Sequence, residues 1–458
     1  MDPTIEHTPV PGLLVVRAPV HHDARGWFTE AWQREKLIAL GLPDFGPVQH
    51  NISYNARRGA TRGIHAEPWD KFVTVVHGSV FGAWVDLREG ESFGATHSVE
   101  IGPGVAVFVP RGVGNSYQAL TDDVVYSYLV NDHWRPGATY PALALDDPDA
   151  AIDWPIPLGQ AVISDKDQAN PRLGQVTPFA RSRPLILGGN GQIGRALRAL
   201  LPDAVAPTRE ELDLTDPAAL DAYDVRPHDL VINAAAMTAV DAAETPQGSR
   251  LAWRLNADLP AQLARRSVTD RFTLVHYSSD YVFDGRSREH DESEPLTPLG
   301  EYGRTKAAGD LAVGVAPRHY LLRTSWVVGE GSNFVATMAR LAREGISPSV
   351  VDDQHGRVSF ADEIAAATLH LVRGAPFGTY NVSQSGASMT WADLAREVFV
   401  ACGREAGDVT GVSTREYAAG KDMAPRPTHS TLSLSKLTST GYAPADQLDV
   451  LRRYLEGN

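Results

Sequence analysis

The sequence predicts two domains of different fold class, an N-terminal all-β domain and a C-terminal α/β domain with a doubly wound parallel sheet. Three observations lead to this prediction. The chain has 458 residues, more than one hydrophobic core usually organises. Up to about residue 161 it consists of short alternating apolar runs broken by turn residues. From residue 184 onward, apolar strands alternate with helical segments. We expect domains at 1–175 and 184–458, joined by a linker at 176–183.

The N-terminal pattern is typical of an antiparallel sandwich or barrel. Turn signals such as His77-Gly78 and Arg111-Gly112 separate its apolar runs. One segment in this half, 31–40, has a helical pattern. Strands are expected at 72–76, 80–85, 105–109 and 124–129.

The pattern changes near Ser182. Pro171, Gly174 and Pro178 stand among polar residues, so the stretch 168–183 has a linker-like composition, and the expected linker 176–183 lies at its end. Beyond it, apolar strands alternate with helices, an arrangement typical of a parallel sheet with helices on both faces. The expected strands are 184–187, 230–233 and 272–276, and 260–267 is an expected helix.

Composition excludes several function classes. The formal charge is −14 and no long run of Lys or Arg occurs, so nucleic acid and anionic membranes are poor partners, whereas local Arg pockets could hold a phosphorylated small molecule. The single cysteine, Cys402, rules out an intrachain disulfide and argues against a cysteine-built metal site. We find neither a secretory signal nor an apolar run of roughly 18 residues, and expect a soluble cytoplasmic protein.

A glycine-rich turn predicts a nucleotide cofactor. Gly188, Gly191 and Gly194 form G-x-x-G-x-x-G, with Gln192 and Ile193 inside it, between an apolar strand and a helical pattern. Such glycines let backbone amides approach a pyrophosphate at a helix N-terminus. A glycine trio can be only a turn, but the flanking strand and helix favour cofactor binding. Further along, Asp213 and Leu214 would border the adenine or ribose, and the nearby Arg209 leaves both NADH and NADPH open.

A possible reaction centre follows. Tyr302 and Lys306 share one face of an expected helix, and Ser279 ends an apolar strand upstream. The Lys306 ammonium would lower the pKa of the Tyr302 phenol, which suits proton transfer at a carbonyl oxygen, and Ser279 would be a second donor to it. Tyr-x-x-x-Lys also occurs by chance on amphipathic helices. With the glycine turn and the prolines Pro295 and Pro298, the pattern is typical of an extended short-chain dehydrogenase/reductase.

The C-terminal half resembles dTDP-4-dehydrorhamnose reductase over roughly residues 184–458. The segments that carry the resemblance are 233–241, 279–285, 302–306, 323–326 and 351–356. The resemblance implies a Rossmann-type domain with a small substrate-binding subdomain, and catalytic roles for Ser279, Tyr302 and Lys306. It places the cofactor against Ala234, Ala235, Ala236, Thr238 and Val240, and the sugar nucleotide against Asp280, Tyr281, Trp326 and Asn333.

Three features bear on this resemblance. Ser279 stands where threonine is usual, and Arg357-Val358-Ser359 replaces a usual Pro-Thr ending. The acidic residues Asp291, Glu292 and Glu294 resemble a divalent-ion and dimer region, which leaves Mg²⁺ open, although a solvated charge run is the slightly favoured explanation.

His65 is the N-terminal candidate. A histidine on a β scaffold is more often a structural residue or a metal ligand than a base, but His50 and His77 are the other candidates nearby and no His-x-His pair occurs. The surrounding motifs resemble dTDP-4-dehydrorhamnose 3,5-epimerase over about residues 5–175. That family has a cupin-like jelly-roll barrel. The segments that carry this resemblance are 23–30, 48–51, 62–65, 85–88, 108–112, 146–148, 154–155 and 164–167.

The epimerase resemblance implies a set of roles. His65 would be the base, Asp167 its orienting carboxylate, Lys71 the cation near the enolate oxygen and Tyr128 the acid. Substrate would contact Arg25, Phe28, Glu30, Gln49, Asn51 and Arg62, with the two arginines holding the diphosphate. Tyr126 competes with Tyr128, while Asn115 and Trp134 stand where histidine and tyrosine are usual.

Together these features predict a fused enzyme that binds a small nucleotide sugar and forms homodimers. It would epimerise dTDP-4-dehydro-6-deoxy-D-glucose and reduce the C4 ketone with NADPH or NADH to give dTDP-L-rhamnose. Three alternatives stay open: the same reactions on a related sugar, a regulatory protein with a reductase-like fold, and a barrel that only dimerises the reductase.

Overall fold

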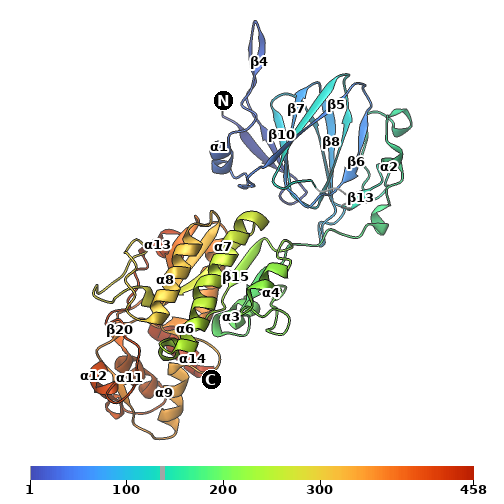
Figure 1. Ribbon diagram of the computed structural model, residues 1–458. Coiled ribbons are helices and arrows are strands. Elements are labelled where there is room, and N and C mark those ends of the chain that lie inside the picture. Colours follow the sequence, from blue (N-terminus) through green and yellow to red (C-terminus); the bar gives the residue numbers. More distant parts are fainter. Residues whose placement is uncertain (1, 135–139, 458) are drawn as a thin grey trace. The chain divides into compact units, whose positions relative to one another are not determined.

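The computed structural model describes residues 2–134 and 140–457, and the chain forms two compact units, Met1–Arg181 and Ser182–Asn458 (Figure 1). No helix in the described ranges is long and apolar enough to cross a bilayer.

The first unit packs a six-stranded antiparallel sheet against a five-stranded one. Its core includes Trp84, Val107 and Tyr126, whose side chains are almost fully buried. The four strands expected from alternation are all present. In order across each sheet, the strands are β1 (Thr4–His7), β2 (Leu14–Arg17), β10 (Val105–Val109), β7 (Lys71–His77), β12 (Val124–Val130) and β5 (Gln49–Asn55), then β13 (Ala142–Leu143), β6 (Thr61–His65), β11 (Val113–Ala119), β8 (Val80–Asp86) and β9 (Thr96–Ile101).

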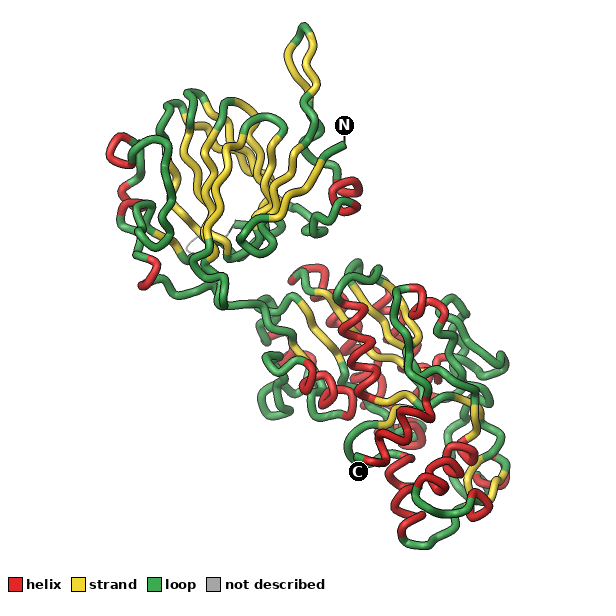
Figure 2. The backbone as a smooth tube through the Cα atoms, turned by 180° about the vertical axis from the view of Figure 1, so that it is seen from behind, coloured by secondary structure: helices red, strands yellow, loops and turns green. Residues whose placement is uncertain are grey.

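Short elements decorate these sheets. The expected helix at 31–40 is the shorter α1 (Arg34–Ala39), because Gln33 caps it by accepting from Lys36 N. The helix α2 (Asp165–Gln168) was not expected and begins after the cap residue Ser164. The hairpin of β3 (His21–Asp23) and β4 (Gly26–Phe28) projects from the body of this unit (Figures 1 and 2).

The expected linker 176–183 is largely part of the first unit. Val176 is buried in that unit, and Phe179 exchanges backbone hydrogen bonds with Leu87 and Glu89 at 2.7 and 3.0 Å. Apolar side chains of this proline-containing segment pack against the first unit, so the boundary between the two units lies between Arg181 and Ser182.

The second unit contains a five-stranded parallel sheet, as alternation predicted. The strands, in order, are β14 (Leu185–Leu187), β15 (Leu230–Asn233), β16 (Thr273–Ser279), β17 (His319–Thr324) and β22 (Gly378–Asn381). Between β14 and β15 in the chain, a single bridge joins Val205 to Leu185 in place of a second strand, because the following Pro207 has no N–H to extend the ladder.

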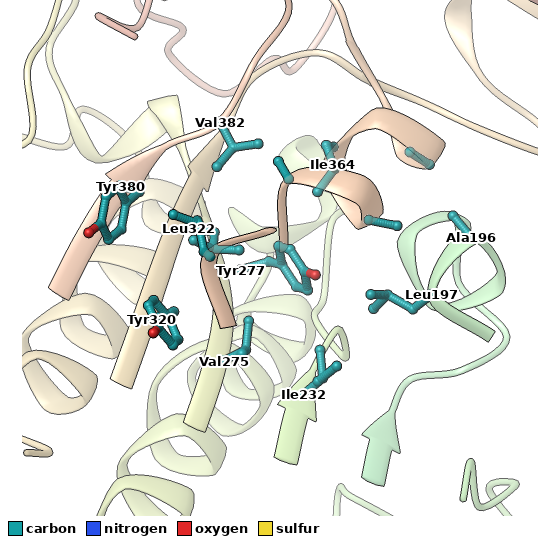
Figure 3. Packing of buried hydrophobic residues seen from close by; sticks show 14 of the residues in the cluster. Ala196, Leu197, Ile232, Val275, Tyr277, Tyr320, Leu322, Ile364, Tyr380 and Val382 are labelled. Carbon is teal, nitrogen blue, oxygen red and sulfur yellow. The ribbon is translucent and has the colours of Figure 1, made fainter. Parts of the chain in front are cut away.

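Helices cover both faces of this sheet. Figure 3 shows one buried layer, where Ala196 and Leu197 of α3 (Gln192–Leu200) and Ile364 of α10 (Ala361–Val372) lie toward Ile232 and Val275 of the strands. The other face packs against α7 (Leu259–Asp270) and α8 (Glu301–Gly314). The remaining helices near the sheet are α4 (Pro217–Ala222), α5 (Val240–Ala243), α6 (Pro246–Trp253) and α13 (Ser435–Ser439).

A smaller part with its own core follows the sheet. Val335, Leu394 and Phe399 are fully buried there. Its elements are β18 (Val327–Val328), α9 (Phe334–Arg343), β19 (Ser349–Val351), β20 (His355–Gly356), β21 (Ser359–Phe360), β23 (Met389–Thr390), α11 (Trp391–Ala401), β24 (Thr410–Val412), α12 (Thr414–Tyr417) and α14 (Gln447–Glu456).

Candidate functional site

His65 and Asp167 form a hydrogen-bonded pair in the first unit. His65 ends β6, α2 presents Asp167, and His65 Nε2 lies 2.8 Å from Asp167 Oδ1. A Cβ on Gly63 would lie 2.3 Å from that oxygen, so glycine is required for the pair to close. Burial disfavours the Asp167 carboxylate, but hydrogen bonds from Ser164 and His65 hold its pKa below the ordinary value. The His65 side chain stays 29% exposed, so the imidazole is accessible for proton transfer.

Lys71 and Tyr128 lie together on the neighbouring strands β7 and β12. The buried Lys71 ammonium pairs with Glu67 and lies 5.8 Å from the centre of the Tyr128 ring. Burial, Glu67 and Tyr117 raise the pKa of the Tyr128 phenol, while Arg62 opposes the rise. A proton-holding phenol beside an ammonium can act as an acid.

Tyr126, in contrast, is buried in the hydrophobic core of the first unit. Its hydroxyl donates to Asn115 Oδ1 at 3.2 Å, and its ring stacks on Tyr117 at 4.0 Å. Asn115 is the register partner of His65 and also accepts from Trp84 Nε1 at 2.9 Å. The geometry therefore favours the half-buried Tyr128 over Tyr126 as the acid.

The predicted substrate residues of the first unit fall into two groups. Gln49 donates to Asn51 at 2.9 Å, and Asn51 pairs with Tyr128 across β5 and β12. Arg62, on β6, donates hydrogen bonds to Asn55 and Ser53 of β5. These residues lie on strands next to the His65 and Tyr128 positions.

The other group lies on or beside the projecting hairpin. Arg25 pairs with Asp23 at 2.6 Å, the Phe28 ring is 68% exposed, and Glu30 pairs with Lys36 at 2.8 Å. Among the described residues, the hydrogen bonds of these charged groups do not reach His65. Trp134, which stands where a tyrosine was expected, is exposed and its amide donates to Gln49 at 3.3 Å.

In the second unit, the glycine turn lies directly against the loop after β15. Gly188 has a φ of +78°, and a Cβ there would lie 2.6 Å from Ala235 N. A Cβ on Gly194 would lie 2.2 Å from Gly188 O. Both positions therefore need glycine. The backbones of 188–194 and 234–236 meet in front of α3, which fits a bound pyrophosphate.

Other predicted cofactor residues surround this turn. Gln192 donates to Ser332 O at 3.3 Å, while its buried Oε1 has no partner among the described residues and is available to a ligand. Ile193 packs on the sheet core, Leu214 packs on the opposite core and Thr238 is exposed. Ala234 and Ala236 are half-buried beside Ala235.

Asp213 shapes a turn. Its Oδ1 accepts from Thr215 N at 2.9 Å and from Thr215 Oγ1 at 2.7 Å, and these bonds hold the pKa of Asp213 below its ordinary value. Arg209 lies 3.9 Å from the same oxygen.

Ser279, Tyr302 and Lys306 meet where β16 runs beside α8. Lys306 Nζ donates to Tyr277 O at 2.6 Å, and Ser279 Oγ donates to Asp280 Oδ1 at 2.8 Å. Burial raises the pKa of Tyr302 to about 12, opposed by a hydrogen bond with Ser279. The expectation that Lys306 lowers this pKa is wrong, because burial outweighs any such effect. Burial also lowers the pKa of Lys306 to about 8.

Sequence reasoning missed a buried ion pair beneath Lys306. Asp310 lies one helical turn beyond Lys306 and accepts from Arg323 Nε at 2.9 Å, with both side chains buried. The Asp310 charge opposes the fall of the Lys306 pKa. The four-residue spacing was a usable signal.

Asn256 is a second missed residue. It lies in the π-helical segment Arg254–Asp258, where its side chain bonds both Met237 N and Met237 O at 3.0 Å and donates to Thr305 at 3.2 Å. These hydrogen bonds connect the loop before α5 with the helix α8. No sequence pattern signals a π-helical turn.

The predicted sugar-nucleotide residues separate into two places. Burial raises the pKa of Asp280 to about 6, and the Tyr281 ring meets Tyr302 edge-on at 5.5 Å. Arg426, also missed, pairs with Asp241 at 2.8 Å and lies beside Tyr281. Asp280 and Tyr281 therefore border the Tyr302 centre.

Trp326 and Asn333 lie in the smaller part. The Trp326 ring stacks on Trp391 at 3.7 Å. Asn333 caps α9 and donates to Gly329 O at 2.7 Å and to Tyr454 at 2.9 Å, so its amide is already engaged by the fold. The buried Arg357 donates to backbone carbonyls.

The acidic segment gives no support to a magnesium site. Asp291 accepts from Ser293, Glu292 from Asn381 N, and Glu294 bonds His290. Among the described residues, no three His, Cys, Asp or Glu side chains are grouped to hold a metal ion.

Comparison with known proteins gives two family matches. Residues 182–456 match the RmlD substrate binding domain, and residues 7–175 match dTDP-4-dehydrorhamnose 3,5-epimerase. A Streptococcus pyogenes protein named RmlC homolog is 44% identical over 37% of this chain and 89% of its own. A Mycobacterium tuberculosis dTDP-4-dehydrorhamnose reductase is 36% identical over 57% of this chain and 88% of its own. The crystal structure of a Bacillus anthracis dTDP-4-dehydrorhamnose reductase in complex with NADP, 32% identical, aligns with a TM-score of 0.56 over 61% of this chain and 100% of its own.

Proposed function

Because the chain belongs to the dTDP-4-dehydrorhamnose 3,5-epimerase family and to the family of the RmlD substrate binding domain, we propose that it performs two consecutive steps. Residues 1–175, as a cupin-like jelly-roll barrel, epimerise dTDP-4-dehydro-6-deoxy-D-glucose at C3 and C5. Residues 184–458, as a Rossmann-type reductase, then reduce the C4 ketone to give dTDP-L-rhamnose. One observation carries the proposal: a single chain holds the imidazole–carboxylate pair of His65 and Asp167 and, in its other unit, the buried Ser279, Tyr302 and Lys306.

In the epimerisation, His65 removes the acidic proton next to the C4 ketone. Asp167 accepts from the imidazole and stabilises the imidazolium that forms. Lys71 stabilises the enolate oxygen, and Tyr128 gives its proton to the opposite face of the carbon. Exchange with water then removes the proton from His65 and restores the one on Tyr128. Gln49, Asn51 and Arg62 contact the nucleotide side of the substrate.

In the reduction, a bound nicotinamide cofactor supplies the hydride. The glycine turn fits such a group, because its backbone leaves no room for a Cβ at Gly188 or Gly194. Tyr302 holds a proton for the C4 oxygen, and the Ser279 hydroxyl turns from Asp280 Oδ1 to donate its single proton to the same oxygen. Lys306 contacts the cofactor side of the site, while Asp280 and Tyr281 border the sugar. The relative solved with NADP supports NADPH as the cofactor.

The active form that we propose is a homodimer. Trp27 and Phe28 on the projecting hairpin are 43% and 68% exposed, an arrangement that a partner surface would cover. Contacts of Arg25, Phe28 and Glu30 with substrate would then arise in the dimer. Analytical ultracentrifugation of the chain and of a Phe28→Ser variant tests this, and a monomeric parent chain contradicts it.

Product identification tests the proposed function. The chain is incubated with dTDP-4-dehydro-6-deoxy-D-glucose and NADPH, and the nucleotide sugar is identified by NMR. We expect dTDP-L-rhamnose. Another deoxysugar would show that epimerisation or reduction takes a different stereochemical course on this substrate, and unchanged substrate would overturn the proposal.

A further inference from the structure

A cavity of about 500 Å³ opens beside the glycine turn of the second unit. Its lining includes Arg195 and Arg198 of α3, Ala206 after the Val205 bridge, and Glu330. Ala196 and Leu197 of this helix lie toward the strands (Figure 3). The next residue, Arg198, is exposed.

The cavity lies where the adenosine end of a dinucleotide is expected. A Cβ on Gly189 would lie 2.9 Å from the Ala206 Cβ and 3.2 Å from Arg198 Cδ. The glycine turn, the segment that follows the Val205 bridge and Arg198 therefore lie next to one another. In dinucleotide-binding folds the adenosine ribose lies at the end of the second strand.

The charge at this point favours a phosphate over a bare ribose. Residues 204–208 contain no carboxylate that could bind a ribose diol. Asp213 is engaged with Thr215. Arg195 pairs with Glu330 at 3.2 Å, whereas Arg198 has only a long contact of 3.4 Å to Asn190 Oδ1 and, among the described residues, no carboxylate partner.

We propose that Arg198 binds the 2′-phosphate of NADPH and makes the second unit select NADPH over NADH. The inference rests on the proposed reductase function. A guanidinium can give two parallel hydrogen bonds to a phosphate, and these have no counterpart in NADH.

Two nucleotide probes test the inference on the full chain by isothermal titration calorimetry. 2′,5′-ADP carries the extra phosphate, and ADP does not. The parent chain should bind 2′,5′-ADP more tightly. Arg198→Ala should weaken 2′,5′-ADP by about tenfold or more and leave ADP nearly unchanged. Arg198→Lys should retain part of the preference, and the exposed Arg265→Ala on α7 serves as the matched control and should change neither affinity.

Equal affinity of the parent chain for both probes, or equal weakening of both by Arg198→Ala, would overturn the inference. Neither probe needs the sugar substrate. If the probes bind as expected but no keto sugar is reduced, the proposed reaction fails while the phosphate site stands. If neither probe binds, the cofactor site is absent and both proposals fall.

Discussion

His65 Nε2 and Asp167 Oδ1 lie 2.8 Å apart although 102 residues separate them in the chain. The bond joins the end of β6 to the four-residue helix α2. The proposed base of the first unit is thus oriented by a carboxylate that a short helix supplies from a distant part of the chain.

Removing the imidazole should abolish proton exchange at C3 and C5. His65→Ala should slow deuterium incorporation from D₂O into the keto sugar by about 10²- to 10⁴-fold, because general bases contribute that much. Asp167→Asn should give a smaller loss, since the imidazole stays in place but loses its orienting charge. Proton NMR of the sugar measures both. Reduction of already epimerised substrate is the control and should not change.

Gly63 should be intolerant of a side chain. A Cβ there would lie 2.3 Å from Asp167 Oδ1 and 2.8 Å from His65 Nε2, so Gly63→Ala must push the pair apart. Exchange should fall and the first unit should lose about 1–3 kcal/mol of unfolding free energy. Gly174→Ala is the matched control, because a Cβ at Gly174 meets nothing within 4 Å. Similar exchange rates in both variants would contradict the dyad.

The pH dependence of the reduction rate should reflect the ionisation of Lys306. Its pKa is lowered to about 8, so the ammonium is lost as pH rises through that value, and kcat/KM for the cofactor should fall above it. The Asp310 charge supports the ammonium, so Asp310→Asn should move this decline to lower pH, and Asp310→Glu should restore it. A profile unmoved by Asp310→Asn would show that the ion pair is only structural.

The buried Asp280 carboxylate should lower the free energy of unfolding of the second unit at neutral pH. Its pKa is raised to about 6 in the folded chain, above the ordinary 3.8, so the folded state binds more protons between these values and stability falls as pH rises through them. Asp280→Asn should remove this fall and stabilise the second unit at pH 7 by about 1–3 kcal/mol. Denaturant unfolding at pH 4 and pH 7 measures the difference, which should grow with pH. Reduction should weaken, because Asp280 borders the sugar.

Sequence patterns were most informative where structure is local. Period-two alternation located the strands β7, β8, β10 and β12, and the glycine spacing located the turn before α3. The antiparallel and parallel order of the two units was confirmed. Tertiary packing determined two features that the sequence did not show. Apolar contacts place most of the expected linker in the first unit, and burial raises the pKa of Tyr302, which was expected to be lowered.

Residues that act through distant partners were the hardest to predict. Asp167 was found only through a family resemblance, because nothing local connects it with His65. Arg426 meets Asp241 across 185 positions, and Asn256 depends on a π-helical turn. Their roles come from tertiary contacts, which spacing along one chain does not reveal.

The assignment of epimerisation to the first unit and of reduction to the second is tested most directly with Tyr302→Phe in D₂O. The variant is incubated with dTDP-4-dehydro-6-deoxy-D-glucose and NADPH, and the sugar is examined by NMR. We expect a keto sugar that carries deuterium at C3 and C5 but is not reduced, whereas His65→Ala added to this variant should leave the substrate unlabelled. Full reduction by Tyr302→Phe, or labelling that persists without His65, would contradict it.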